Sequence, residues 1–201
     1  MIEAIVLAAG KGERLGAVKP LVAVGGQPAL ERVLKTLRAA GIDRILVVLG
    51  YARDQVTAGV DLSGCRVIVN EDFEEGMGSS LALGIRSLAP EAEGFLVLHA
   101  DRPYLTPQTI RAVVAAARKG ARIAAPSYRG ERGFPVYFDR ACAASLLPTL
   151  DGEMGARGYL AKHADEVKLV PVDDVGAVRD IDRPEDLEPK ERAHESLVHQ
   201  S

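Results

Sequence analysis

The stretch MIEAIVLAAGKGERLGAVKP, residues 1–20, decides the fold. It starts with an apolar run at residues 2–7, which has the length and composition of a buried β-strand. Three glycines and three cations follow within ten positions. Such a loop after a first strand suits three structures: a phosphate cradle, a dinucleotide-binding loop, or an ordinary connection from strand to helix.

Apolar runs and amphipathic segments alternate along the first two thirds of the chain. The patterns predict strands at 2–7, 44–49, 66–70, 94–100 and 122–126, and helices at 28–40, 78–88 and 106–119. This alternation is typical of a three-layer α/β/α fold with a mostly parallel, Rossmann-like sheet. Farther along, we expect a strand at 133–138, helices at 139–148 and 153–163, and strands at 167–172 and 177–181 as antiparallel additions.

The composition and the charge limit the classes of function that the chain can have. Residues 1–187 are expected to form one domain, and residues 188–201 a polar, mobile tail. A net charge of −3 gives no bulk attraction to nucleic acid or an anionic membrane, so neither is an expected partner. The chain has no apolar run of the roughly 20 residues that a membrane span needs. Two cysteines far apart in sequence, without a signal peptide, predict a cytoplasmic protein.

Three loops follow predicted strands: residues 8–18, 71–80 and 101–105. Because ligands of parallel sheets bind outside the carboxyl ends of the strands, we expect these loops to meet at one site.

The first loop fits neither common phosphate motif. A P-loop is excluded because the chain contains no GKS or GKT. Gly10, Gly12 and Gly16 are spaced G-x-G-x-x-x-G, one residue longer than the dinucleotide fingerprint.

A third interpretation fits the loop better. Small residues at Ala8, Ala9 and Gly10 let the backbone approach a ligand closely, and their N–H groups can bind an anion. Arg14 and Lys19 can then neutralise phosphate oxygens. The alternative is a solvated connection whose cations face water.

Several motifs resemble one family. LAAGKGERLGAVK, residues 7–19, resembles the signature L-A-[AG]-G-x-[GS]-x-R-[ML]-G-x-x-K of MobA-like NTP transferases. NEDFEEGMGSSLALGI (70–85) and HADRPYLTPQTI (99–110) resemble the second motif and the metal-binding segment of its molybdenum cofactor cytidylyltransferase branch. GFPVYF, DGEMGARGYLAKH and DIDRPEDL follow in the family's order. The resemblance spans about residues 2–187 and implies a fold of the nucleotide-diphospho-sugar transferase type.

The resemblance implies a Mg²⁺-dependent transfer of CMP from CTP to molybdopterin cofactor, with release of pyrophosphate. A molybdoenzyme or its chaperone would then receive the product. The implied catalytic residues are Arg14, Lys19 and Asp101. The implied nucleotide-binding residues are Leu7, Ala8, Ala9, Gly10, Gly12, Lys19, Asn70, Ser79 and Ser80.

The implied metal ligands are Asp101 and Asp182. Asp101 follows an apolar strand, a position that suits a hard oxygen ligand for Mg²⁺, but Asp there also commonly caps a turn. Asp182 precedes Pro184 and is equally suited to cap a helix. Asp180, two residues earlier, is a reserve ligand.

The nucleotide contacts also have alternatives. Ser79 and Ser80 start a predicted helix, where they either cap it or bind the nucleotide. A methyl group at Ala9, where the guanylyl branch has Gly, favours the smaller base cytosine over guanine, although GTP remains an alternative.

The acceptor side departs from the family pattern. Gly133, Phe134 and Arg157 correspond to its acceptor-binding segments, but Phe134 stands where the family often has His, and Arg102 where Gln is usual. Arg157 either pairs with a phosphate or faces solvent. His99 either orients Asp101 or is structural.

Two other functions fit the same residues. One is transfer to another phosphorylated acceptor, such as a sugar phosphate or small metabolite. The other is a non-catalytic nucleotide or cofactor carrier, which would not need two metal-binding carboxylates.

Overall fold

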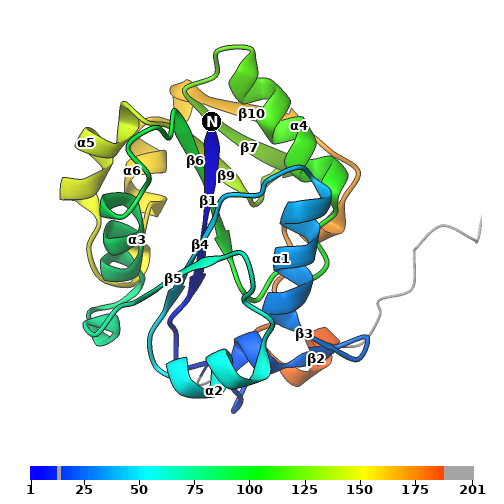
Figure 1. The fold of residues 1–201 in the computed structure, drawn as a ribbon. Helices are drawn as coiled ribbons and strands as arrows, with labels where there is room; N and C mark the ends of the chain where they lie inside the picture. Colours follow the sequence, from blue (N-terminus) through cyan, green and yellow to red (C-terminus); the bar gives the residue numbers. More distant parts are fainter. Residues whose placement is uncertain (13–14, 188–201) are drawn as a thin grey trace, which may run out of the picture.

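The computed structural model describes residues 1–12 and 15–187. The fold is built around a central β-sheet (Figure 1). Its strand order is β10-β7-β9-β6-β1-β4-β5, with β8 paired to β7. The strands are β1 (Ile2–Ala8), β4 (Ile45–Leu49), β5 (Arg66–Val69), β6 (Gly94–His99), β7 (Ile123–Tyr128), β8 (Glu131–Arg132), β9 (Val136–Asp139) and β10 (Val167–Pro171). A separate hairpin pairs β2 (Ala23–Val24) with β3 (Gln27–Pro28).

Helices cover both faces of this sheet. In Figure 1, α1 and α4 lie on one side, and α3, α5 and α6 lie on the other. The helices are α1 (Ala29–Ala39), α2 (Arg53–Gly59), α3 (Met77–Arg86), α4 (Pro107–Arg118), α5 (Cys142–Leu146) and α6 (Arg157–Lys162). The predicted three-layer architecture is confirmed.

Strand β1 supplies both halves of the core because its side chains alternate between the two faces. Ala4 and Val6 pack with Leu30 of α1 in one apolar cluster, whereas Ile5 packs with Leu81 of α3 in the other. All five side chains are almost completely buried. Burial of each large apolar side chain stabilises the fold by about 1.5–3 kcal/mol. A strand apolar on both faces can therefore only be central.

The C-terminal third differs from the expected arrangement. Strand β9 is the antiparallel addition, inserted between β6 and β7, whereas β10 pairs with β7 in parallel. The strand expected at 177–181 is absent from the described structure: a 3-10 helix occupies Val175–Ala177, and an irregular segment follows. Isolated backbone bonds hold this segment, from Phe134 N to Ala177 O and from Ile181 N to Asp101 O. Its apolar residues are therefore buried without a strand partner.

Helix boundaries differ as well. Helix α2 was not predicted, because only Val56 of its seven residues is buried and no apolar period is visible. The helices expected at 139–148 and 153–163 are shorter, as α5 and α6. Gly155, with a φ of 49°, interrupts the second one before α6 begins.

In the described part of the chain, no helix is both long enough and apolar enough to cross a membrane. The predicted tail, 188–201, lies outside the described residues.

Asp174 ties the C-terminal segment to the start of α4. Its buried carboxylate accepts hydrogen bonds from the backbone and hydroxyl of Thr106 (3.0 and 2.7 Å), from the Thr109 hydroxyl (2.5 Å) and from Gly176 N (2.9 Å). This one side chain therefore fixes both the N-terminus of α4 and the segment that leads to Asp182.

We predict that Asp174→Ala lowers the free energy of unfolding by about 2–4 kcal/mol, because it leaves several buried donors unpaired. Urea denaturation would measure the loss. The exposed neighbour Asp173 offers the matched control, and Asp173→Ala should change stability by less than about 0.5 kcal/mol. Equal effects of the two substitutions would contradict this role for Asp174.

Candidate active site

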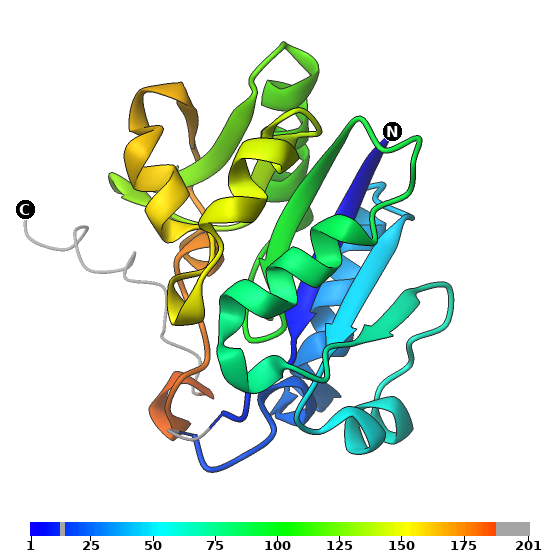
Figure 2. The ribbon, with the colours of Figure 1, turned by 90° about the vertical axis from the view of Figure 1, so that its left-hand side faces the viewer.

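The loops after β1, β4 and β6 meet at one end of the sheet, as the parallel topology requires. The Ala9 carbonyl accepts a hydrogen bond from Tyr51 N (3.1 Å), and the Leu7 carbonyl accepts one from Ala100 N (3.0 Å). The Asp101 carbonyl accepts one from Ile181 N (2.9 Å), which brings the C-terminal segment to the same end. Figure 2 shows this segment (orange) beside the glycine-rich loop (blue).

The glycine-rich loop begins with buried side chains and then opens to solvent. Leu7, Ala8 and Ala9 are 6–8% exposed, whereas Gly10 is exposed and has open space where a side chain would begin. Gly12 has a φ of 65°, and its carbonyl accepts hydrogen bonds from the backbone N–H groups of residues 15 and 16 (3.1 and 3.2 Å). A side chain at position 12 would collide with the carbonyl of Ala17, so this turn needs glycine. Arg14 lies outside the described residues.

Lys19 joins two carboxylates that are remote in sequence. Its Nζ donates to Asp101 Oδ2 (3.2 Å) and to Asp182 Oδ1 (2.9 Å). The side chains of Lys19 and Asp101 are 19% exposed and that of Asp182 is 30% exposed. Burial by itself lowers the pKa of Lys19, but the hydrogen bond to Asp182 and the charge of Asp101 outweigh it and raise the pKa. The lysine is therefore an ammonium ion between two carboxylates.

The two C-terminal aspartates make different contacts. The Asp186 carboxylate accepts hydrogen bonds from the backbone N–H groups of residues 182 and 183 (3.0 and 2.9 Å), at the start of the short 3-10 helix at Pro184–Leu187. Asp180 is directed to Arg102, with Oδ2 3.6 Å from Nη2. The reserve ligand is therefore paired with Arg102 in this structure.

The position that Lys19 occupies suits a divalent cation. Its ammonium shows that two carboxylate oxygens, from separate loops, converge on one positive charge. Mg²⁺ favours one or two carboxylates and completes its shell with water and phosphate oxygens. No group of three metal-ligating side chains converges within residues 1–12 and 15–187. Asp101 and Asp182 would hold the ion, and nucleotide phosphates and water would supply the remaining ligands.

Asn70, Ser79 and Ser80 bond to one another. The Asn70 amide donates to the Ser79 hydroxyl (2.8 Å) and the Ser80 hydroxyl (2.9 Å), and the Ser79 hydroxyl donates to the Gly76 carbonyl (2.8 Å). Asn70 and Ser80 are 4% and 3% exposed. In this structure the three side chains hold the loop between β5 and α3. Their contact with a nucleotide stays a prediction.

Two side chains pack on the ring of Phe134, a residue predicted to bind the acceptor. The His99 ring meets it edge-on, with centroids 4.7 Å apart, and the Arg102 guanidinium carbon lies 4.4 Å from its centroid. Gly133 packs against the Ala177 carbonyl. Arg157, exposed at the first residue of α6, lies near enough for its charge to act on Arg102 and His99.

His99 is a neutral imidazole at physiological pH. Burial is the main cause and lowers its pKa to about 4, and the charges of Arg102 and Arg157 act in the same direction. Asp101 opposes them without reversing the shift. The ring contacts Phe134, so the packing role weighed for His99 has direct support in the structure, whereas orientation of Asp101 has none.

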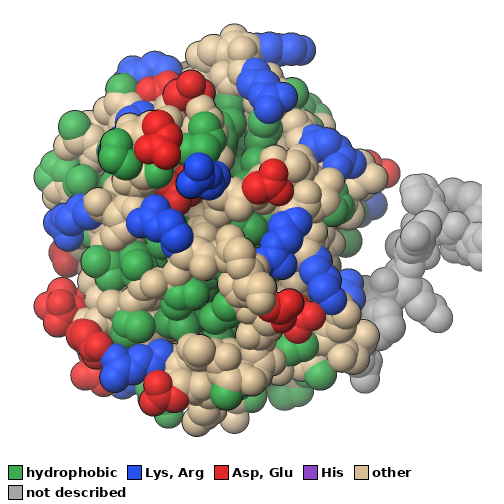
Figure 3. All heavy atoms as spheres, in the orientation of Figure 1, with side chains coloured by type: hydrophobic (Ala, Val, Ile, Leu, Met, Phe, Trp, Pro, Cys, Tyr) green, Lys and Arg blue, Asp and Glu red, His purple; other side chains and the backbone are tan. Residues whose placement is uncertain are grey.

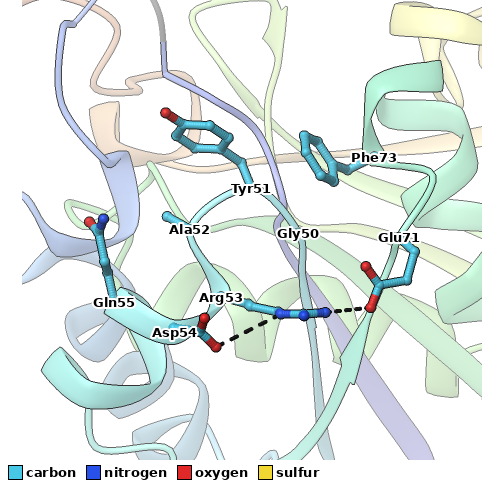
Figure 4. Close-up of a pocket in the computed structure, with 8 residues that line it drawn as sticks. All are labelled: Gly50, Tyr51, Ala52, Arg53, Asp54, Gln55, Glu71 and Phe73. Atoms are coloured by element: carbon cyan, nitrogen blue, oxygen red, sulfur yellow. Dashed lines mark hydrogen bonds and ion pairs between the residues drawn. The ribbon is translucent and has the colours of Figure 1, made fainter.

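A pocket of about 280 Å³ borders the glycine-rich loop (Figure 4). Tyr51 and Phe73 make an edge-on contact across it at 6.2 Å, and Arg53 pairs with Glu71. A side chain at Gly50 would come within 2.8 Å of Ala9, so this wall lies directly against the loop. Its lining residues are Gly50, Tyr51, Ala52, Arg53, Asp54, Gln55, Glu71 and Phe73. The sequence did not predict this pocket, because residues 50–55 carry no recognisable motif.

The face of the molecule seen in Figure 1 carries charges of both signs. On the face seen in Figure 1, the described Lys and Arg side chains are interspersed with Asp and Glu (Figure 3). On this face neither sign of charge forms a continuous patch.

Comparison with known proteins decides the family. Residues 4–167 match the MobA-like NTP transferase domain. The chain belongs to this family. As a MobA-like protein it is 30% identical to the nicotine blue oxidoreductase of Paenarthrobacter nicotinovorans over 92% of this chain and 94% of that protein. It is also 30% identical to the purine catabolism protein PucB of Bacillus subtilis, over 94% and 95% of the two chains.

The solved structure of Rv0371c from Mycobacterium tuberculosis superposes on this MobA-like protein with a TM-score of 0.83, at 30% identity, over 92% of this chain and 94% of that one. Rv0371c has also been solved in complex with manganese. The fold is shared with nucleotide-diphospho-sugar transferases: a CMP-2-keto-3-deoxy-manno-octonic acid synthetase aligns with a TM-score of 0.66 at 16% identity, over 85% of this chain and 89% of that one.

We predict that Lys19 competes with a divalent cation. Lys19→Met should therefore tighten Mn²⁺ binding by the nucleotide-free protein, and Asp101→Asn should weaken it about tenfold or more. Electron paramagnetic resonance of free Mn²⁺ would measure both affinities.

Lys35 supplies the control, because it lies half-exposed on α1 and pairs with Glu31. Lys35→Met should leave Mn²⁺ affinity unchanged. If Lys19→Met binds Mn²⁺ no better than the wild type, the ammonium does not occupy the metal position.

Proposed function

We propose that this MobA-like protein transfers CMP from CTP to molybdopterin cofactor and releases pyrophosphate. The observation that carries the proposal is the contact of Lys19 with Asp101 and Asp182, beside a glycine-rich loop at the carboxyl ends of the strands. Nucleotidyl transfer between two anions needs this combination of a cation, metal-holding carboxylates and backbone donors.

Each group of residues has its own role in the proposed transfer. The acceptor's terminal phosphate attacks the α-phosphorus of CTP, the bond to the β-phosphate oxygen breaks, and pyrophosphate leaves. Lys19 turns from the carboxylates to the phosphates and neutralises charge there, while the loop backbone at residues 8–12 binds phosphate oxygens. Asp101 and Asp182 would hold Mg²⁺, which would neutralise charge on the phosphates. Arg14 assists Lys19 on the evidence of sequence alone.

The choice of base rests on the second motif more than on Ala9. The Ala9 methyl packs against Gly50 and is only 6% exposed, so it acts on the base through the position of the backbone. Residues 70–85, which resemble the cytidylyltransferase branch, support CTP. GTP is the alternative nucleotide.

The compartment and the recipient are part of the same proposal. Cys65 and Cys142 are both free thiols, which suits a reducing cytoplasm. We place the catalytic unit in residues 1–187 and expect a molybdoenzyme or its chaperone to receive the product.

A second candidate function is transfer to a different acceptor. Phe134 and Arg102 occupy positions where the family pattern has other residues. Two full-length relatives are named for other processes, one as an oxidoreductase and one for purine catabolism. A sugar phosphate or another phosphorylated metabolite is therefore the alternative acceptor. A carrier without catalysis is less well supported, because it would not need Lys19 between two carboxylates.

Pyrophosphate release tests the proposal directly. The protein, Mg²⁺ and molybdopterin cofactor are combined with CTP, GTP, ATP or UTP, and CTP should give the fastest release and the largest thermal stabilisation. Turnover with sugar phosphates but not with the cofactor would overturn the acceptor. Consumption of reduced nicotinamide without pyrophosphate release would point to the chemistry that the name of one relative suggests.

We predict that Asp101→Asn lowers the turnover number about 100-fold or more while the melting temperature stays within a few degrees. Lys19→Ala should raise the KM for the nucleotide and slow transfer. Lys35→Ala, on the outer face of α1, should match the wild type. Unchanged kinetics at position 101 or 19 would remove that residue from the mechanism.

A further inference from the structure

Arg102 is held in a fixed place beside the metal-holding carboxylates. It directly follows Asp101, and its side chain is only 12% exposed. The guanidinium stacks on the face of Phe134 at 4.4 Å, and Nη1 donates to the Ala177 carbonyl (3.2 Å). A stacked, hydrogen-bonded guanidinium keeps its plane and direction, so it presents its remaining donors at a defined position.

The charge and donors of Arg102 are only partly satisfied within the described residues. Its nearest carboxylate, Asp180, lies 3.6 Å from Nη2 and is 49% exposed. Its Nε is buried and has no hydrogen-bond partner there. Exposed Arg157 adds a second positive charge nearby. A loosely paired, preoriented guanidinium with a spare buried donor suits an anionic ligand.

We propose that Arg102, held by its stack on Phe134, binds an anionic phosphate group of the acceptor and selects for acceptors that carry one. This inference rests on the proposed nucleotidyl transfer and names the class of its acceptor. Arg102 lies next to Asp101, so an anion bound there would sit beside the metal-holding carboxylates. The nucleophile of the proposed reaction is itself a phosphate.

Phe134 is the positioning residue of this subsite. Arg102 covers its face, and neutral His99 meets its edge at 4.7 Å without adding charge. The two departures from the family pattern, Arg for Gln and Phe for His, are therefore one structural unit. A Gln at position 102 would lack the charge, and a His at 134 would offer a smaller ring to the guanidinium. Their effects on acceptor binding should be coupled rather than additive.

A purely structural role is the competing explanation, because Arg102 also ties residues 177–180 to the sheet. The two roles predict opposite results for Asp180→Asn. If Arg102 is structural, loss of its partner weakens the site or leaves it unchanged. If Arg102 binds the acceptor anion, loss of the competing carboxylate strengthens anion binding.

The first experiment measures binding without catalysis. Inorganic phosphate, a mimic of the acceptor's nucleophile, is titrated calorimetrically into protein saturated with Mg²⁺ and a CTP analogue with a methylene between the α- and β-phosphorus atoms. Arg102→Gln should weaken phosphate binding about tenfold, and Asp180→Asn should tighten it several-fold. The exposed Arg118→Gln, on α4, is the matched control and should bind like the wild type. Equal phosphate affinity in all four proteins would overturn the inference.

The second experiment divides the kinetic constants. Arg102→Gln should raise the acceptor KM about tenfold and leave the nucleotide KM within about twofold, whereas a folding defect would change both. Phe134→His should share part of this effect, and the double variant should be less impaired than the product of the single ones. Phe134→Tyr, which keeps an aromatic face for the guanidinium, should leave the acceptor KM close to that of the wild type. An unchanged acceptor KM in Arg102→Gln would refute the assignment.

Failure of this inference and failure of the proposed function give different results. If the wild type transfers no nucleotide to any acceptor but phosphate binding still depends on Arg102 and Asp180, the anion subsite stands and the proposed function fails. If the wild type transfers nucleotide and neither variant alters acceptor or phosphate binding, the proposed function stands and this inference fails.

Discussion

The bond from one ammonium ion to two carboxylates is the interaction on which the candidate site depends. Lys19 follows the first loop, Asp101 comes two residues after the central strand β6, and Asp182 lies near the far end of the described chain. Separately, each charge would be costly to half-bury, and together they compensate one another. The same arrangement suits a triphosphate with its metal, since a divalent cation can take the place of the ammonium while the lysine turns to the phosphates. The resting contact and the proposed working state therefore use the same three groups.

One antiparallel strand brings Phe134 next to Asp101 and Arg102. Parallel strands β1, β4 and β6 send their following loops to a common end, but β9 runs in the opposite direction between β6 and β7. Its start, next to Phe134, therefore lies beside the end of β6, where Asp101 and Arg102 follow. The C-terminal segment then packs across this junction through Gly133 and Ala177. The antiparallel insertion therefore places Phe134, a predicted acceptor-binding residue, beside Asp101, a predicted metal ligand.

Members of the family share this fold but are named for different functions, so the function of each has to be argued from its site. The glycine-rich loop and the Lys19 contact belong to the part that we propose binds the nucleotide. The stack of Arg102 on Phe134 belongs to the part in which this chain departs from the family pattern. The two parts are in direct contact, both at Asp101 and Arg102 and where Gly76 and Gly78 pack against residues 151–153.

Local pattern by itself determined the three-layer architecture, since β1 is apolar on both faces and α1 has an apolar stripe. Short motifs predicted the loop, Lys19 and Asp101 as site residues. It did not determine α2, because a helix with a single buried residue shows no apolar periodicity in its sequence. It did not determine the parallel direction of β10 either, because the residues of a strand do not specify which strand it pairs with. Only the tertiary structure decided that Asp182 reaches Lys19 while Asp180 turns to Arg102, and that Arg102 stacks on Phe134. These contacts join residues 32 to 163 positions apart. Side chains so remote meet only after burial of the core has placed their loops, and so the chain's local patterns cannot reveal them.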